Sequence, residues 1–62
     1  MQINPTELGQ LAYKAYGGAV NNRNHQGLPL PEWDDLGPQI TTAWEVAAEA
    51  VARKALRLAA RT

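Results

Sequence analysis

Residues 37–60 read GPQITTAWEVAAEAVARKALRLAA, and they predict one long helix. Pro38 suits the first helical position, Gly37 is a tolerable N-cap, and no further glycine or proline interrupts the stretch. Apolar side chains recur along it at helical spacing, at Ile40, Ala43, Trp44, Ala47, Val51, Ala55 and Leu58. We therefore expect a helix over residues 38–60, which at about 1.5 Å per residue would be on the order of 33 Å long.

A second, shorter helix is predicted near the start of the chain. Residues 4–7 read NPTE, which combines an N-cap residue, a proline for the first helical position and a glutamate that can complete a capping box. The apolar positions that follow form one stripe, at Leu8, Leu11, Ala12, Ala15, Tyr16 and Ala19. Glycine is favoured where helices end, so Gly17-Gly18 predicts a C-terminus near residue 17. We expect this helix over about residues 5–17.

The segment between the two helices has the composition of a loop. Amide and imidazole side chains crowd residues 21–25, and this leaves open whether the centre forms a tight turn or a short hairpin. The prolines of residues 29–31 forbid a regular helix and favour extended geometry for the leucines beside them. Residues 32–36 are suited to one short helical turn.

The two helices differ in length, and the difference predicts self-association. The expected fold is all-α, a single small domain of residues 1–62 in which a long Asn/Pro-rich loop joins a helical hairpin. A helix over residues 5–17 would reach only ~20 Å, so it cannot cover both ends of the longer helix. Another copy of the chain is the expected cover, in a homo-oligomer assembled through the C-terminal helix. The predicted interface residues are small or apolar: Val51, Ala55, Leu58 and Ala59.

Composition narrows the functional classes. Six acidic and six basic residues give a net charge of zero, which argues against bulk attraction to nucleic acid or to an anionic membrane. The chain has no cysteine, no apolar run near the ~18 residues of a membrane span, and no initial stretch that resembles a secretory signal. We therefore expect a soluble protein of the cytoplasm without membrane or nucleic-acid partners.

The residues that could carry catalysis are few. The chain has no serine and no cysteine, and its one histidine, His25, lies in the polar loop without an evident nucleophile or second metal ligand. Adjacent carboxylates such as Asp34 and Asp35 diverge in most backbone geometries, and their charge complements the dipole of the helix that follows. We expect no catalytic residues, no metal site and no cofactor, and hence no enzyme.

The aromatic side chains are Tyr13, Tyr16, Trp33 and Trp44. The break at residues 37–38 turns the chain, so Trp33 can fold back and cap the packing that Trp44 starts. Tyr16 falls on the apolar stripe and Tyr13 at its border, and we expect both hydroxyls to reach water. The functional alternative is that these aromatic faces stack on a ligand beside the polar loop.

The long helix carries its acidic residues early and its basic residues late. Glu49 and Arg53 have the spacing of a favourable i,i+4 pair. Arg53, Arg57 and Arg61 recur every four residues as a basic stripe. One interpretation is a solvated face that compensates the helix dipole, and the other is an anion site where the stripes of two chains converge.

About two-thirds of the chain, residues 12–50, resembles a widespread group of very small phage and prophage proteins. Their pattern runs roughly AYxAYG, a polar loop with Asn, GxPLPxW, and then LPxxIxxAWxxAAxAV. The matching positions are Ala12, Tyr13, Ala15, Tyr16, Gly17, Asn24, Gly27, Pro29, Leu30, Pro31, Trp33, Leu36, Ile40, Ala43, Trp44, Ala47 and Ala48. The proline after Leu36 is shifted by one to Pro38, so the resemblance does not fix the residue at which the long helix begins.

The resemblance implies a non-enzymatic binding protein of phage or prophage origin. Some phage proteins of this size are similar in kind to nucleotide sponges, which sequester a cyclic nucleotide signal of host immunity, and our first hypothesis is such an anti-defence role. The expected ligand-binding residues supply aromatic faces for stacking, an amide for a base edge and arginines for phosphate: Tyr13, Tyr16, Trp33, Asn24, Arg23 and Arg53. The alternative is a protein-interaction module that inhibits or recruits a host protein through the surface of the long helix.

Overall fold

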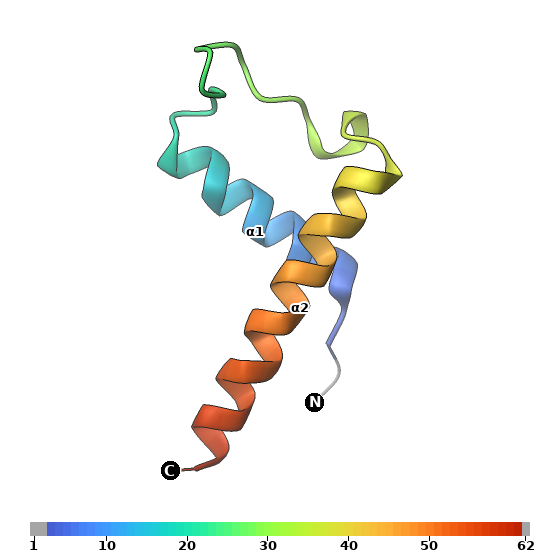
Figure 1. Cartoon of the computed structure of the whole chain (residues 1–62), viewed down its shortest axis with the longest axis vertical. Coiled ribbons are helices and arrows are strands. Elements are labelled where there is room, and N and C mark those ends of the chain that lie inside the picture. Colours follow the sequence, from blue (N-terminus) through green and yellow to red (C-terminus); the bar gives the residue numbers. More distant parts are fainter. Residues whose placement is uncertain (1–2, 62) are drawn as a thin grey trace.

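The described part of the chain folds into two α-helices and one short 3-10 turn (Figure 1). The computed structural model describes residues 3–61, in which α1 spans Pro5–Ala19, η1 spans Trp33–Asp35 and α2 spans Pro38–Ala60. No strand occurs within this described range. The predicted all-α fold class and the predicted bounds of the long helix are therefore confirmed.

Both helices begin as the sequence predicts. The side-chain oxygen Oδ1 of Asn4 accepts a hydrogen bond from the backbone N–H of Glu7 at 3.2 Å, which makes Asn4 the N-cap of α1. Gly37 precedes Pro38 with a φ of 84°, a left-handed conformation in which a side chain would be strained. The start of α2 at Pro38 thus depends on glycine at the preceding position.

The C-terminus of α1 corrects the sequence prediction, because the helix continues through Gly17-Gly18 to Ala19. The signal that ends it is asparagine. Asn21 and Asn22 both adopt a φ of 58°, and their backbone N–H groups bond back to the carbonyls of Gly18 and Gly17 at 3.4 and 2.7 Å. This is the pattern of a Schellman motif, in which asparagine tolerates the left-handed position better than most residues.

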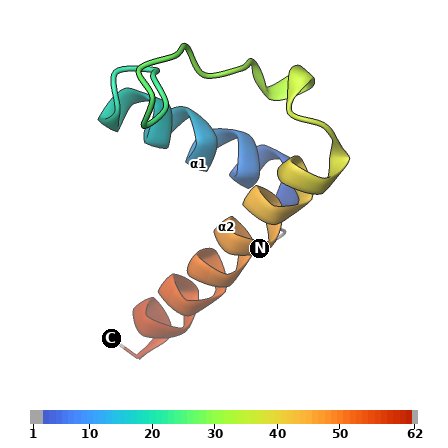
Figure 2. The same cartoon turned by 45° about the horizontal axis from the view of Figure 1, so that its top comes forward.

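The two helices cross and then diverge, so the predicted hairpin is splayed instead of lying side by side along its length (Figures 1 and 2). The crossing point is at Gly9, which is buried against Glu45 of α2. A Cβ atom added at Gly9 would stand 2.8 Å from Cγ and 3.1 Å from Cα of Glu45. The absence of a side chain at Gly9 therefore sets how closely α1 approaches α2.

An aromatic cluster lies beside this crossing. The ring of Tyr13 packs between the two tryptophans, with centroids 6.0 Å from Trp33 and 5.4 Å from Trp44. Tyr16 also contacts Trp44, with ring centroids 5.3 Å apart. Trp33 therefore folds back toward Trp44 as predicted. The sequence predicted that Tyr16 would be more buried than Tyr13, and this was wrong. Tyr13 is the more buried of the two, and Tyr16 is 42% exposed.

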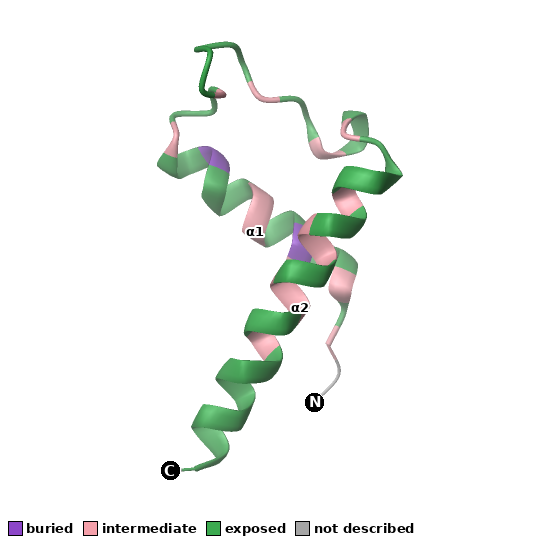
Figure 3. Ribbon diagram, in the orientation of Figure 1, coloured by how far each residue is buried: buried purple, intermediate pink, exposed green. Residues whose placement is uncertain are grey.

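Few residues of the described chain are buried (Figure 3). Among residues 3–61 no apolar side chain is fully buried, whereas Val51 is 70% and Leu11 63% exposed. The chain is correspondingly elongated, with extents of 42 × 22 × 13 Å and a radius of gyration of 13.4 Å, compared with about 10.5 Å for a compact domain of this length. The second half of α2 extends past α1, as the length difference predicts (Figure 1).

The polar loop folds back on itself through a single antiparallel bridge between Arg23 and Pro29. Asn24 organises the turn, because its Oδ1 accepts hydrogen bonds from the N–H groups of Gln26 and Leu28 at 2.8 and 3.0 Å. The guanidinium of Arg23 donates to the carbonyl of Gly27 at 2.9 Å. The question that the composition left open is thus answered by a tight turn with one bridge.

Candidate binding site

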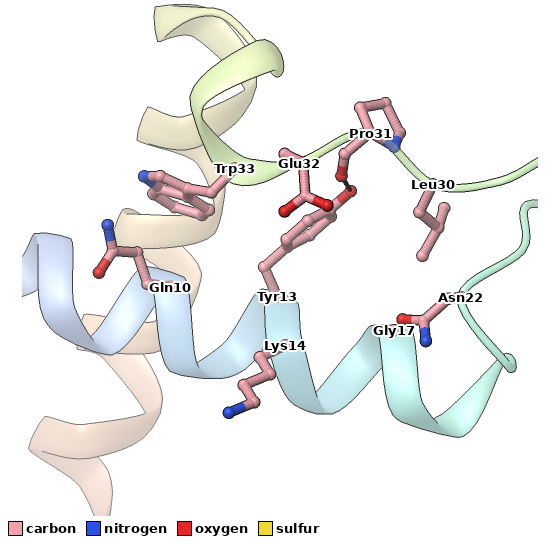
Figure 4. Close-up of a pocket in the computed structure, with 9 residues that line it drawn as sticks. All are labelled: Gln10, Tyr13, Lys14, Gly17, Asn22, Leu30, Pro31, Glu32 and Trp33. Carbon is pink, nitrogen blue, oxygen red and sulfur yellow. Dashed lines mark hydrogen bonds between the residues drawn. The ribbon is translucent and has the colours of Figure 1, made fainter.

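A polar pocket lies between α1 and the loop segment of residues 30–33, which we call the strap (Figure 4). Its volume is about 510 Å³, within the range of ~300–1,000 Å³ that is usual for small-molecule sites. The residues that line this strap pocket are Gln10, Tyr13, Lys14, Gly17, Asn22, Leu30, Pro31, Glu32 and Trp33.

Two hydrogen bonds hold the strap over α1. The hydroxyl of Tyr13 donates to the carbonyl of Pro31 at 2.6 Å, which corrects the prediction that this hydroxyl reaches water. At the other end of the strap, the N–H of Leu30 donates to the carbonyl of Asn22 at 2.8 Å. Gly17 makes room below, because a Cβ atom there would stand 2.7 Å from Oδ1 of Asn22. The pocket is thus built by contacts between segments distant in sequence.

The electrostatics of the pocket are mixed. Burial raises the pKa of Tyr13 above its ordinary value of 10.0, and the negative charges of Glu32 and of ionised Tyr16 raise it further. Tyr13 is consequently a neutral hydrogen-bond donor at physiological pH. Figure 4 shows the Lys14 side chain pointing away from Glu32 and from the strap, so the two charges do not face each other.

Polar side chains around the pocket are available to a ligand. Those of Gln10, Lys14, Asn22 and Glu32 form no hydrogen bond or ion pair with any part of the chain that the structure describes. Amides both donate and accept hydrogen bonds, an ammonium donates three, and a carboxylate accepts. Together with the rings of Tyr13 and Trp33, they can bind a planar polar molecule.

The structure brings together two of the six predicted ligand-binding residues, Tyr13 and Trp33. Tyr16 packs against Trp44 outside the strap pocket. Arg23 and Asn24 use polar atoms within the loop turn. Arg53 lies on α2 and forms the predicted ion pair with Glu49 at 2.7 Å.

Sequence reasoning missed the polar side chains of this pocket. Gln10, Lys14 and Gly17 share one side of α1 with Tyr13, and helical spacing alone would have grouped them. Asn22 and Glu32 come from the loop and the strap, whose path no periodic pattern predicts. The strap position had to be known before this set could be recognised.

A second concavity, which we call the apolar groove, lies between α1 and α2 and shares no lining residue with the strap pocket. It measures about 420 Å³ and is lined by Leu8, Leu11, Ala12, Ala15, Trp44, Ala47, Ala48, Val51 and Ala52. Of the predicted oligomer interface, Val51 lines this groove and Leu58 is exposed. Ala55 and Ala59 line an adjoining hollow that shares Leu8 and Ala52 with the groove.

No protein-family profile, curated protein or solved structure matches this chain. Neither helix has the combined length and apolar character needed to traverse a bilayer, as far as the described residues go. Within residues 3–61, no three His, Cys, Asp or Glu side chains gather as metal ligands would. The strap pocket and the apolar groove are therefore the features of the chain that point to a function.

Proposed function

We propose that this chain is a non-enzymatic binding protein of phage or prophage origin that holds a small, ring-containing anionic ligand of the nucleotide class in the strap pocket. The observation that carries the proposal is the convergence of Tyr13 and Trp33 with polar side chains that have no partner elsewhere in the described chain. Sequestration of a cyclic nucleotide signal is the role we propose for such a site, in line with the resemblance to small phage proteins.

Each part of the pocket has a role in this proposal. Trp33 provides an aromatic surface against which a base can stack, an interaction that contributes ~1–3 kcal/mol per base. The amides of Gln10 and Asn22 match the mixed donors and acceptors of a base edge. Lys14, which also lines the pocket, supplies the positive charge for the phosphate in this proposal.

Isothermal titration against a panel of cyclic di- and trinucleotides tests this function. We expect one class to bind, and we expect Lys14→Ala to weaken it about tenfold or more, because hydrogen bonds to charged groups contribute ~1.5–3 kcal/mol. Lys54→Ala removes the same charge from α2 outside the pocket and is the matched control. Failure of every nucleotide to bind at millimolar ligand would exclude the proposal.

The same titration tests the roles predicted for the remaining residues. Arg23→Ala and Asn24→Ala disturb the loop turn, so their effect on binding must be compared with their effect on folding. Tyr16→Phe and Arg53→Ala leave the strap pocket intact and should not change affinity if one chain forms the whole site. Loss of affinity in Arg53→Ala would instead indicate a site shared between chains.

A second candidate function is docking of a host protein on α2. Val46 is 62% exposed and shares a helical face with Arg53 and Arg57, at spacings of seven and four residues. An exposed valine followed by arginines on the same face suits a partner with an apolar patch beside acidic groups. This function predicts that nucleotides do not bind, whereas a pull-down from host lysate recovers one partner with the wild type and not with Arg57→Glu.

A further inference from the structure

We propose that a second copy of this chain covers the apolar groove, in a twofold dimer where the α1–α2 face of each copy packs against that of the other. Two large apolar side chains of the groove, Leu11 on α1 and Val51 on α2, are mostly exposed. No other element of the described chain reaches this face, because the strap and the loop lie against different residues of α1. The groove is therefore an apolar surface that nothing within residues 3–61 covers.

The exposed area matches what a dimer needs. The chain exposes 5027 Å², whereas a compact protein of 6.8 kDa exposes about 4,000 Å². The excess of about 1,000 Å² is close to the ~800 Å² that each partner buries in a stable interface of standard size. Pairing of the α1–α2 faces around the groove would remove part of this excess.

The groove is complementary to itself. Leu11 and Val51 project as large side chains, and the alanines between them, including Ala15 and Ala47, leave shallow holes. In a twofold interface the same patch meets itself, so the projections of one copy face the holes of the other. Alanine holes allow helices to approach closely and large apolar side chains to interlock, as in other helical assemblies.

Charge also favours a second copy as the occupant. None of the residues that line the groove is charged, and the net charge of the chain is zero. Two copies can therefore associate without desolvating ionic groups or repelling each other. This inference is independent of the strap pocket, which shares no residue with the groove and stays open in such a dimer.

Light scattering and sedimentation equilibrium of the full chain test the dimer, with Val51→Asp and Val46→Asp as a matched pair. Both valines are exposed positions within α2, but only Val51 lines the groove. We expect the wild type to have a mass of twice 6.8 kDa, and Val46→Asp to keep this mass. In Val51→Asp the dissociation constant Kd of the dimer should rise at least about a hundredfold, because the interface would bury an unpaired charge. Leu11→Glu should have the same effect from α1.

Each other outcome overturns the proposal. A wild type that stays monomeric at every micromolar concentration would show that no second copy covers the groove, even if nucleotides or a host protein still bind. A dimer that survives both Val51→Asp and Leu11→Glu, or one lost equally in Val46→Asp, would place the interface elsewhere. If Val51→Asp unfolds, the wild-type melting temperature must rise with protein concentration, as mass action requires for a dimer, and a constant value would contradict the inference.

Discussion

Gly9 of α1 lies directly against the backbone of α2 at Glu45, and a Cβ atom at Gly9 would stand 3.1 Å from the Cα atom of Glu45. The same atom would stand 3.0 Å from Cη2 of Trp33. One glycine therefore fixes both the approach of the two helices and the position of the tryptophan that borders the strap pocket. The glycine also weakens α1, since glycine within a helix costs roughly 0.5–1 kcal/mol relative to alanine.

Gly9→Ala should destabilise the protein although it improves helix propensity. The added methyl group meets backbone of α2, which cannot move aside as a flexible side chain can, and overpacking of this kind costs ~1–3 kcal/mol. Gly18→Ala is the matched control in the same helix, because nothing lies within 4 Å of its added Cβ atom. Urea unfolding followed by circular dichroism should show Gly9→Ala below and Gly18→Ala at or above the wild type. Equal stability of the two variants would contradict the close approach at Gly9.

Tyr13→Phe should lower the free energy of unfolding by about 0.5–1.5 kcal/mol, the usual contribution of one hydrogen bond. The hydroxyl that it removes donates to the carbonyl of Pro31 at 2.6 Å and holds the strap. Tyr16→Phe removes a hydroxyl with no partner in the described chain and should be nearly neutral. Chemical denaturation of the two variants compares them directly, and an equal loss in both would argue against a specific role for the Tyr13 bond.

The raised pKa of Tyr13 predicts a loss of stability in alkaline solution. In the unfolded chain Tyr13 ionises near its ordinary pKa of 10.0, whereas in the folded chain burial, followed by the charges of Glu32 and Tyr16, keeps it neutral to higher pH. The unfolded state therefore loses its proton first. The stabilisation is complete below pH 10 and declines as pH rises through the folded pKa.

Ultraviolet titration of Tyr16→Phe, in which Tyr13 is the remaining tyrosine, measures this shift. The midpoint should lie above 10.0 in the folded protein and return toward 10.0 in concentrated urea. Identical midpoints in the two conditions would show that the folded chain does not shield this hydroxyl.

Asn24→Ala should open the loop turn, because Oδ1 of Asn24 accepts two backbone hydrogen bonds, from Gln26 and Leu28. Asn24→Asp keeps an acceptor oxygen in the same place and should preserve most of the structure. Amide hydrogen exchange at Gln26 and Leu28 distinguishes the variants, with faster exchange expected in Asn24→Ala alone. His25→Ala, at the neighbouring exposed position, serves as the control. Unchanged exchange in Asn24→Ala would mean that the bridge between Arg23 and Pro29 is sufficient to hold the turn.

The sequence by itself determined the features that depend on neighbours along the chain. These features involve residues within about one helical turn of each other. They are the ends of α2, the caps at Asn4 and Gly37, and the ion pair between Glu49 and Arg53. The excess length of α2 over α1 also follows from counting residues. The C-terminus of α1 is a local feature that was missed, because Asn21 supplies the left-handed conformation that Gly17-Gly18 was expected to supply.

Only the tertiary structure decided which side chains meet across the chain. Tyr13 and Pro31 are 18 residues apart, and Gly9 and Glu45 belong to different helices, so no periodic pattern could pair them. The strap pocket exists because the hydrogen bonds from Tyr13 to Pro31 and from Leu30 to Asn22 hold residues 30–33 over one side of α1. This position groups Gln10, Lys14 and Asn22. Local hydrogen bonding fixes where a helix begins and ends, whereas the path between helices depends on steric fit and on a few long-range bonds, which are properties of the folded chain.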